Sequence, residues 1–230
     1  DKKALNTKHD EFSKEFGKDV VHSMLMDVTS EQDVKRAVSN SVNAFGGIDI
    51  LVANAGFASA ALFEKTSSKL WDKNMDILSK GCFLISREVY QKMIDQKNGG
   101  SIIFVSSKNS LNASKGASAY SVAKSSLLHL SRSIALEGSS HKIRSNVVNP
   151  DAVIQNSKIW QGEWTKQRAI SNKISVNQVE EFYKNRSLLK VSILPEDIAE
   201  GIYFFASSKS KKSTGNIINV DGGNITSFTR

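Results

Sequence analysis

The chain has 230 residues, of which 40% are hydrophobic, and 31 Lys and Arg against 23 Asp and Glu give it a formal net charge of +8. This length and composition fit one large globular domain with a substantial core. The longest apolar runs fall far short of the roughly 20 residues that cross a bilayer, so no membrane span is expected. A single cysteine, Cys82, excludes an internal disulfide and fits a reducing cytoplasm. The four separated histidines show no metal-ligand spacing, so no metal site is expected.

The excess of positive charge is spread along the chain rather than gathered in one place. Its only basic cluster is SSKSKKS at 207–213, and a short stretch of serine and lysine is typical of a solvated loop. No aromatic residues are interleaved with the lysines, as base stacking in a single-strand binder would require. A nucleic-acid partner is therefore not expected, although the net charge fits an anionic partner of some kind.

Strands and helices are expected to alternate along the chain, because short apolar runs alternate with stretches of helical periodicity. The predicted strands are 20–26, 49–54, 101–107, 143–149 and 216–220. The predicted helices are 1–16, about 31–45, about 66–96, about 118–137 and 195–207. This alternation, with uninterrupted apolar strands, predicts an α/β fold in which a doubly wound parallel sheet is covered by helices on both faces.

Small and polar residues recur where the predicted strands end. Their positions are Asp27-Val28, Asn54-Ala55-Gly56, Ser106-Ser107 and Asn149-Pro150-Asp151. In open parallel sheets, ligands bind beyond the carboxyl ends of the strands. The sequence therefore predicts a binding site along this edge of the sheet.

Tyr120 and Lys124 lie four residues apart in AYSVAKSS (119–126), within a predicted helix. Residues at i and i+4 share one helix face, so the ammonium can stand close to the phenol. The spacing by itself leaves two interpretations open, a catalytic pair or two polar residues on the solvated face, because one Tyr-x-x-x-Lys is unsurprising in a lysine-rich chain.

Taken together, these residues resemble the short-chain dehydrogenase/reductase family, in which a Rossmann-like, doubly wound sheet binds NAD(H) or NADP(H). The resemblance runs nearly the whole length of the chain and rests on the order and spacing of motifs that are individually weak. The motifs are Asp27-Val28, Asn54-Ala55-Gly56, Ser107 thirteen residues before Tyr120, Tyr120-x-x-x-Lys124, Ser213-Thr214-Gly215 and Val220-Asp221-Gly222-Gly223. Their order favours the catalytic pair.

The resemblance implies that Ser107, Tyr120 and Lys124 are the catalytic residues. A free phenol has a pKa of about 10, and a nearby cation lowers it, so Lys124 would favour the phenolate of Tyr120. Tyr120 would then take the proton of a substrate hydroxyl as hydride leaves the carbon for the nicotinamide. Ser107 would hydrogen-bond the same oxygen, and Lys124 would also hold the nicotinamide ribose.

The resemblance also implies a set of cofactor contacts, with NAD as the expected cofactor and NADP left open. The Asp27 carboxylate would accept from the adenine amino group, unless Asp27 only helps to start the following helix. Gly56 would let the chain approach the adenosine without a Cβ in the way, whereas Asn54 would brace adjacent strands. The backbone of Val153 would bind the carboxamide. The expected cofactor-binding residues are Asp27, Val28, Asn54, Ala55, Gly56, Tyr120, Lys124, Pro150 and Val153.

Two residues depart from the family pattern. Leu78 stands where the family commonly has a catalytic asparagine of a proton relay through water, which puts that relay in doubt. Asp151 replaces the glycine that usually follows the proline after the sixth strand. An acidic group beside the nicotinamide is a candidate substrate contact.

The resemblance extends to one subfamily through two stretches of sequence, VVNPDAVIQNSKIWQGEWTKQRA (147–169) and YKNRSLLK (183–190). They are similar to the dehydrogenase domain at the C-terminus of bifunctional rhamnulose-1-phosphate aldolase/lactaldehyde dehydrogenase proteins. This implies oxidation of L-lactaldehyde to lactate with NAD in rhamnose catabolism, since a hydrated aldehyde is a gem-diol and presents a hydroxyl like any alcohol. Residues from about 155 to 190 would form a substrate lid. Its candidate lining residues, for each of which ordinary packing or solvation is an equally good explanation, are Trp160, Trp164, Arg168, Tyr183 and Arg186.

The family's first strand, glycine-rich pyrophosphate loop and second strand have no counterpart in the sequence, because 1–16 already has the pattern of the helix after the second strand. We therefore expect 1–230 to be one N-terminally incomplete NAD(P)-binding dehydrogenase domain. The strand at 20–26 would lack its usual neighbours, and we expect a gap beside the strand at 49–54 rather than direct pairing. Without the pyrophosphate cradle, the isolated chain should bind NAD(H) poorly and show little or no activity.

Two classes of function stay open. The first is a nicotinamide-dependent dehydrogenase that acts on a small alcohol or aldehyde and, by resemblance, forms a homo-oligomer. The second is a non-catalytic family member that serves as a binding or assembly module through its basic surface. The intact Ser107, Tyr120 and Lys124 favour the first class.

Overall fold

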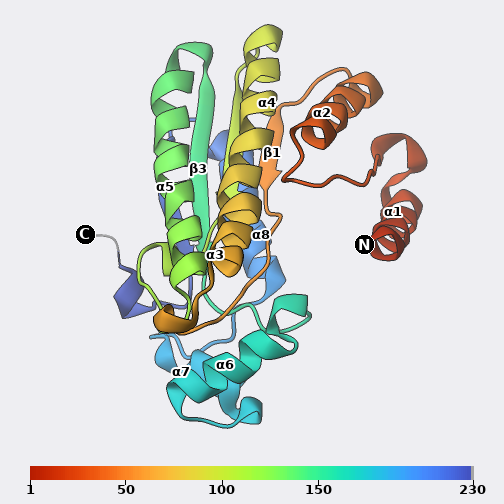
Figure 1. The fold of residues 1–230 in the computed structure, drawn as a ribbon. Coiled ribbons are helices and arrows are strands. Elements are labelled where there is room, and N and C mark those ends of the chain that lie inside the picture. The colour runs from red at the N-terminus through yellow and green to blue at the C-terminus, as the bar shows by residue number, and fades with distance from the viewer. Residues whose placement is uncertain (229–230) are drawn as a thin grey trace.

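The computed structural model describes residues 1–228, whose centre is one parallel sheet with helices on both faces (Figure 1). The sheet has four strands in the order β1-β2-β3-β4, and each neighbouring pair is parallel. The strands are β1 Ile50–Ala53, β2 Gly100–Val105, β3 Ile143–Pro150 and β4 Ile217–Val220. The predicted α/β fold is therefore confirmed, together with the strands predicted at 49–54, 101–107, 143–149 and 216–220.

Helices α4 and α5 pack on one face of the sheet, and α8 packs on the other (Figure 1). Ser30 caps α2 by accepting from the backbone N–H of Asp33, and Pro195 is the first residue of α8. No helix in the described part of the chain is both long and apolar enough to span a bilayer. The helices are α1 Lys2–Phe16, α2 Glu31–Phe45, α3 Ser68–Asn74, α4 Gly81–Gln96, α5 Ser118–Gly138, α6 Glu163–Asn172, α7 Val179–Arg186 and α8 Pro195–Ala206.

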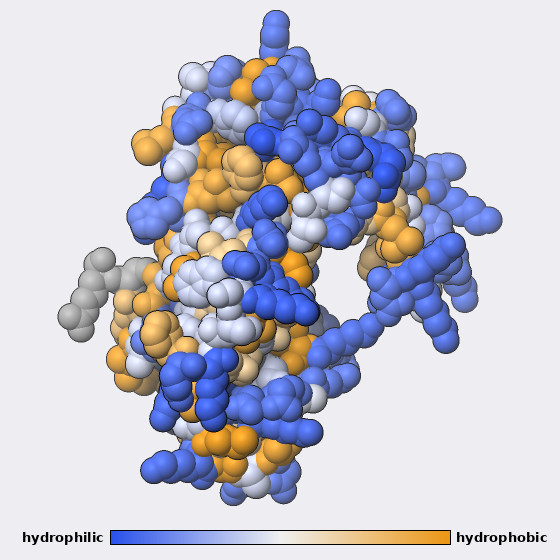
Figure 2. Space-filling model, viewed as in Figure 1, coloured by the Kyte–Doolittle hydropathy of each residue, from blue (hydrophilic) through white to orange (hydrophobic). Residues whose placement is uncertain are grey.

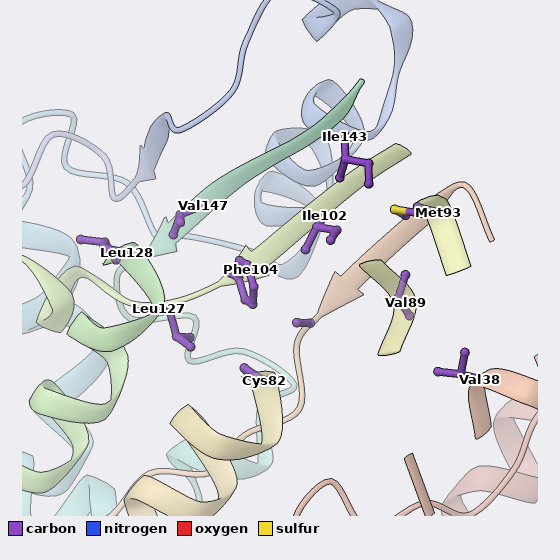
Figure 3. Packing of buried hydrophobic residues seen from close by; sticks show 11 residues of the cluster. Val38, Cys82, Val89, Met93, Ile102, Phe104, Leu127, Leu128, Ile143 and Val147 are labelled. Carbon is purple, nitrogen blue, oxygen red and sulfur yellow. The ribbon is translucent and has the colours of Figure 1, made fainter. Parts of the chain in front are cut away.

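The core divides between the two faces of β2, because successive side chains of a strand point to opposite faces. Phe104 packs against α4 and α5, whereas Ile103 packs against α8. Full burial of one such side chain stabilises the fold by about 1.5–3 kcal/mol, so the middle of the sheet is firmly held. Figure 3 shows the first cluster, whose labelled members are Val38, Cys82, Val89, Met93, Ile102, Phe104, Leu127, Leu128, Ile143 and Val147.

The strand predicted at 20–26 is absent, and this prediction was wrong. Residues 21–27 have no regular secondary structure and pair with no strand, so β1 is an edge of the described sheet. An apolar segment becomes a strand only where a neighbour completes its backbone hydrogen bonds, and none of residues 1–228 does so here. β1 is also less buried than predicted, since Ile50 and Val52 are 49% and 39% exposed.

A cavity of about 540 Å³ lies between this segment and β1. His22, Met24 and Met26 line it from the segment, and residues 50–55 line it from β1 and the turn that follows. Side chains of α2 and α4 complete the wall. Of the two expected arrangements, a gap beside β1 is the one that the structure has.

Helix α1 stands apart from the sheet (Figure 1) and buries none of its residues. Figure 2 shows mainly hydrophilic residues over the visible surface of this part of the molecule. An exposed ion pair, 3.7 Å between Lys158 Nζ and a carboxylate oxygen of Asp1, connects its first turn to the segment that follows β3. The helix predicted at 1–16 is confirmed, and it adds little to the packing.

Candidate active site

The carboxyl end of β2 is joined to α5 by two hydrogen bonds. Ser106 Oγ donates to the backbone carbonyl of Lys124 at 2.9 Å, and Lys124 Nζ donates to the carbonyl of Val105 at 2.8 Å. These bonds fix the first turns of α5 over the end of the strand. The structure thereby brings Ser107, Tyr120 and Lys124 to the wall of one cavity.

Tyr120 is buried, and Ser107 lines the same cavity wall. Burial raises the pKa of the Tyr120 phenol, and the nearby Ser107 hydroxyl opposes that rise. The Lys124 ammonium donates to the carbonyl of Val105, and Ser107 is the group that lowers the pKa of the Tyr120 phenol here. An effect of Lys124 on that pKa stays a prediction.

Lys124 is 6% exposed, and burial lowers the pKa of its ammonium to about 8. An ammonium has three N–H donors, and among residues 1–228 Lys124 has one acceptor, the Val105 carbonyl. Gly56 lies beside it, since a Cβ built there would stand 3.9 Å from Lys124 Nζ. The unused donors are suited to ribose hydroxyls, so the residues present fit the nicotinamide half of a dinucleotide.

The cavity that these residues line has a volume of about 640 Å³ and lies at the carboxyl ends of the strands. Asn54 and Ala55 border both this cavity and the one beside β1. Asp27, Val28 and Arg186 are candidate residues that do not line it. The candidates that do are Asn54, Ala55, Gly56, Ser107, Tyr120, Lys124, Pro150, Asp151, Val153, Trp160, Trp164, Arg168 and Tyr183.

Asp27 has the contacts expected of a residue that helps to start a helix. Its carboxylate accepts from the N–H and the hydroxyl of Thr29 at 2.9 and 2.8 Å, and these bonds lower its pKa. Its own N–H donates to Asp33 in the first turn of α2. Val28 faces the cavity beside β1 instead. These contacts fit the local alternative for Asp27, and because its side chain is exposed the adenine contact stays a prediction.

The expectation that Asn54 braces neighbouring strands is not supported, because its side chain is exposed and makes no hydrogen bond within residues 1–228. Asn149, at the end of β3, has that role instead. Its Nδ2 donates to Asn219 on β4 at 3.3 Å, and its Oδ1 accepts from Ser110 at 3.3 Å. Asn54 is thus left facing the two cavities.

Leu78 lies in a π-helical turn, Met75–Lys80, between α3 and α4. It is fully buried in the cluster that contains Tyr120. An apolar side chain cannot relay a proton, so the departure at Leu78 holds in three dimensions. The buried amide of Asn74, one turn earlier, does not replace it, because Asn74 Nδ2 donates to Ser59 at 2.8 Å and to the carbonyl of Leu70 at 2.7 Å.

The segment 155–190 places aromatic and basic side chains from α6 and α7 against the cavity. The Tyr120 ring lies 5.5 Å from that of Trp164, measured between centroids, and Trp160 lies 5.0 Å from Tyr183. The Arg168 guanidinium stands 4.6 Å from the centroid of the Trp164 ring. The structure therefore brings these four side chains of the candidate lid together beside Tyr120.

Asp151 connects the end of β3 to α7. Both of its carboxylate oxygens accept from the guanidinium of Arg186, and one also accepts from Asn224 Nδ2 at 3.0 Å. The Arg186 guanidinium in turn lies 4.0 Å from the centroid of the Tyr183 ring. Asp151 lines the cavity as predicted, but its carboxylate already has protein partners.

Lys108 is a candidate that the sequence analysis missed. It is 6% exposed, lines the cavity, and donates to Ser114 Oγ at 2.9 Å. Burial lowers the pKa of its ammonium to about 8, with Arg186 and Arg168 acting in the same direction and Asp151 opposing them. In the sequence, only its position directly after Ser107 distinguishes Lys108 from the many other lysines of the chain.

A parallel sheet with helices on both faces and polar residues gathered at the carboxyl ends of its strands is typical of a Rossmann-like α/β protein. Within residues 1–228, no group of three or more His, Cys, Asp or Glu side chains could hold a metal ion. Residues 1–224 match a family model described as enoyl-(acyl carrier protein) reductase. The chain belongs to the short-chain dehydrogenase/reductase family of oxidoreductases.

Individual relatives support this membership. The chain is 50% identical over 220 residues to the uncharacterized oxidoreductase YuxG of Bacillus subtilis, a match that spans 96% of this chain but only 32% of that relative's length. It is 33% identical over 216 residues to sorbitol-6-phosphate 2-dehydrogenase of Escherichia coli, spanning 94% of this chain and 82% of the relative. The crystal structure of sorbitol-6-phosphate 2-dehydrogenase SrlD from Erwinia amylovora superposes with a TM-score of 0.92 at 28% identity, covering 97% of this chain and 87% of that one.

Proposed function

We propose that this chain supplies the catalytic residues of a nicotinamide-dependent dehydrogenase that acts on a small alcohol or a hydrated aldehyde. The observation that carries the proposal is that Ser107, the buried Tyr120 and Lys124, one helical turn further on, line the wall of the same 640 Å³ cavity. Membership of an oxidoreductase family supports the same chemistry.

Each of the three residues has a proposed role. Ser107 and Tyr120 both hydrogen-bond the substrate oxygen, which orients the carbon that loses hydride. The Tyr120 phenolate takes the hydroxyl proton as the C–H bond breaks, so an alcohol becomes a carbonyl and a hydrated aldehyde becomes a carboxylic acid. Lys124 holds the nicotinamide ribose through the N–H donors that the protein leaves unused.

Bound NAD would supply the acceptor for the hydride. Its nicotinamide half would be held by Lys124, by the backbone of Val153 and by Pro150, all of which line the cavity. Residues 54–56 would contact the adenosine half. This is supported by Asn54 and Ala55, which line both this cavity and the cavity beside β1. Asp27 and Val28 remain the proposed adenine contacts, and NAD is proposed over NADP.

We further propose L-lactaldehyde, oxidised to lactate in rhamnose catabolism, as a substrate and 155–190 as the substrate lid. The similarity of 147–169 and 183–190 to the bifunctional aldolase/dehydrogenase proteins supports this substrate. The aromatic wall formed by Trp160, Trp164 and Tyr183 beside the cavity supports the lid.

A homo-oligomer and a cytoplasmic setting complete the proposal. Exposed apolar side chains on α4 and α5, such as Phe83 at 42%, Val122 at 44% and Leu136 at 79%, support self-association. The free thiol of Cys82 supports a reducing compartment. Sedimentation of the full-length protein tests the first point.

The test of the function is NADH formation by the full-length protein, as its gene encodes it, with L-lactaldehyde and 1,2-propanediol. Tyr120→Phe removes the acid/base but keeps the ring, so turnover should fall by about 10²- to 10⁴-fold while NADH binding survives. Lys124→Met should impair both turnover and NADH binding. Tyr90→Phe, on α4 and outside the cavity, is the matched control. Near-normal turnover by Tyr120→Phe would sink the assignment.

A further inference from the structure

The charged side chains that line the 640 Å³ cavity are Lys108, Lys124, Asp151 and Arg168. Asp151 is the one carboxylate among them, and both of its oxygens are bound by Arg186. Within residues 1–228, neither Lys108 nor Arg168 has a carboxylate within ion-pair distance. The wall therefore carries three buried cations without a carboxylate partner, and Lys124 is already assigned to the nicotinamide ribose, which leaves Lys108 and Arg168.

The fold keeps the Lys108 ammonium buried without a carboxylate partner. Its only acceptor in the described chain is the hydroxyl of Ser114, which in turn donates to Asn109 Oδ1 at 2.7 Å. Burying an unpaired charge is costly, and the cost appears here as the lowered pKa of the ammonium. An anion in the cavity would offset that cost, whereas a neutral ligand would not.

Arg168 provides the second half of the site. It is 3% exposed, and its Nη2 donates to the carbonyl of Lys115 at 2.8 Å. Its Nε is buried without a hydrogen-bond partner in residues 1–228, and so is Nε1 of the adjoining Trp164. These two N–H groups are closed off by the surrounding protein, whereas Nη1 of Arg168 makes no hydrogen bond within residues 1–228 and is not fully buried, so it is the donor left for a ligand. Planar guanidinium donors match the oxygens of carboxylates and phosphates.

Both cations adjoin the proposed reacting centre. Lys108 directly follows Ser107, and Arg168 lies over the ring of Trp164, which packs against Tyr120. Resting on the proposed dehydrogenase chemistry, but in place of the neutral lactaldehyde as preferred substrate, we infer that the substrate carries a carboxylate or a phosphate close to the reacting hydroxyl, and that Lys108 and Arg168 bind this anionic group. Such an alcohol is preferred to an uncharged one of the same size.

Three compounds that share one secondary alcohol test the inference in the full-length protein with NAD. These are 1,2-propanediol, which is neutral, lactate, which carries a carboxylate, and 1,2-propanediol 1-phosphate. Wild type should oxidise at least one of the two anions with a higher kcat/KM than the neutral diol, and the better anion identifies the group. Lys108→Met should lower kcat/KM for that anion by about 10- to 100-fold, as expected for one charge-assisted hydrogen bond, and change it less than about 2-fold for the diol.

Two further variants separate charge from structure. Lys108→Arg keeps the charge and should restore much of the loss, and Lys115→Met, which removes an exposed lysine nearby, should have no effect. Equal losses for the anions and the diol in Lys108→Met, or a wild-type preference for the diol, would overturn the inference. The melting temperature of each variant identifies any that fails to fold, in which case Lys108→Gln takes its place.

A binding measurement separates the two proposals from each other. Trp160 and Trp164 line the cavity, so their fluorescence should respond to titration with lactate and with 1,2-propanediol 1-phosphate. Binding that depends on Lys108 without any NAD-linked turnover would reject the dehydrogenase and keep the anion site. Turnover of all three compounds without a charge preference would keep the dehydrogenase and reject the anion site.

Discussion

Two regions of the chain differ in how closely the rest of the fold packs against them: the N-terminal segment 1–27, and the junction between β2 and α5. At the N-terminal end, α1 buries none of its residues, and 21–27 have no strand partner. At the carboxyl end of β2, Lys124 and Ser106 are buried and bonded across the junction of strand and helix. The same kind of apolar sequence thus gives a strand where a neighbouring strand pairs with it and an extended segment where none does. Tertiary partners, rather than local preference, decide the outcome.

Hydrogen exchange should show the largest difference between the two regions. Amides of β2 lie at the centre of the sheet and should exchange only through global unfolding, which for a domain costs about 5–15 kcal/mol. Amides of 21–27 should exchange with almost no protection. Mass spectrometry of the chain Asp1–Arg230 resolves the two segments, and strong protection of 21–27 would break the comparison.

Truncating one phenylalanine in each region sharpens the comparison. Phe104 is fully buried, so Phe104→Ala should lower the free energy of unfolding by about 3–5 kcal/mol. Phe16 on α1 is 61% exposed, and Phe16→Ala should change the free energy of unfolding by less than about 0.5 kcal/mol. Urea denaturation measures both, and similar losses would mean that α1 packs more closely than the structure shows.

Asp151 should matter for stability through its bond with Arg186. Asp151→Asn leaves the guanidinium without its carboxylate, and because Arg186 is partly exposed we expect a loss of about 1–3 kcal/mol, below the range for fully buried pairs. Glu181→Gln removes an exposed ion pair on the same helix, α7, and should cost less than about 0.5 kcal/mol. If Asp151→Asn left stability unchanged but altered the substrate preference, Asp151 would be a substrate contact instead.

The pH dependence of anion binding should be the smallest effect. The pKa of Lys108 is lowered to about 8 by burial and by Arg186 and Arg168, with Asp151 opposing, so the ammonium is charged below pH 8 and loses its proton as the pH rises. The KM for the preferred anionic substrate should therefore rise by up to about tenfold per pH unit above 8, since one charge is lost. Lys108→Arg should remove the part of this rise that Lys108 contributes, leaving the part from Lys124, whose pKa is also lowered to about 8, and a flat wild-type profile would count against Lys108.

Much of the site followed from the sequence because its geometry is local. Ser107 lies at a strand end, and Tyr120 and Lys124 share a helix face, so the order of motifs that resembles the family selected them and the structure places them at one cavity. The pairing of Asp151 with Arg186 joins residues 35 positions apart, and no periodicity reports it. Lys108 was missed because lysines are mostly exposed, and only the three-dimensional structure shows this one buried.

The direction of the Lys124 side chain was also beyond the sequence. Helix geometry places its Cα near that of Tyr120, but the acceptor it selects, the Val105 carbonyl, belongs to another element. The strand at 20–26 failed for the related reason that a strand is a property of at least two segments. Patterns within one segment predict which face is apolar, and they do not predict what will cover it.

Cys82 allows the cavity beside β1 to be probed by thiol labelling. It is the only cysteine of the chain, is 5% exposed, and lines that cavity. Burial raises the pKa of its thiol, with Lys124 opposing, so the thiol stays protonated at neutral pH and reacts slowly with maleimides. Because Cys82 lines that cavity, any molecule or segment that fills the cavity should slow labelling at this one position.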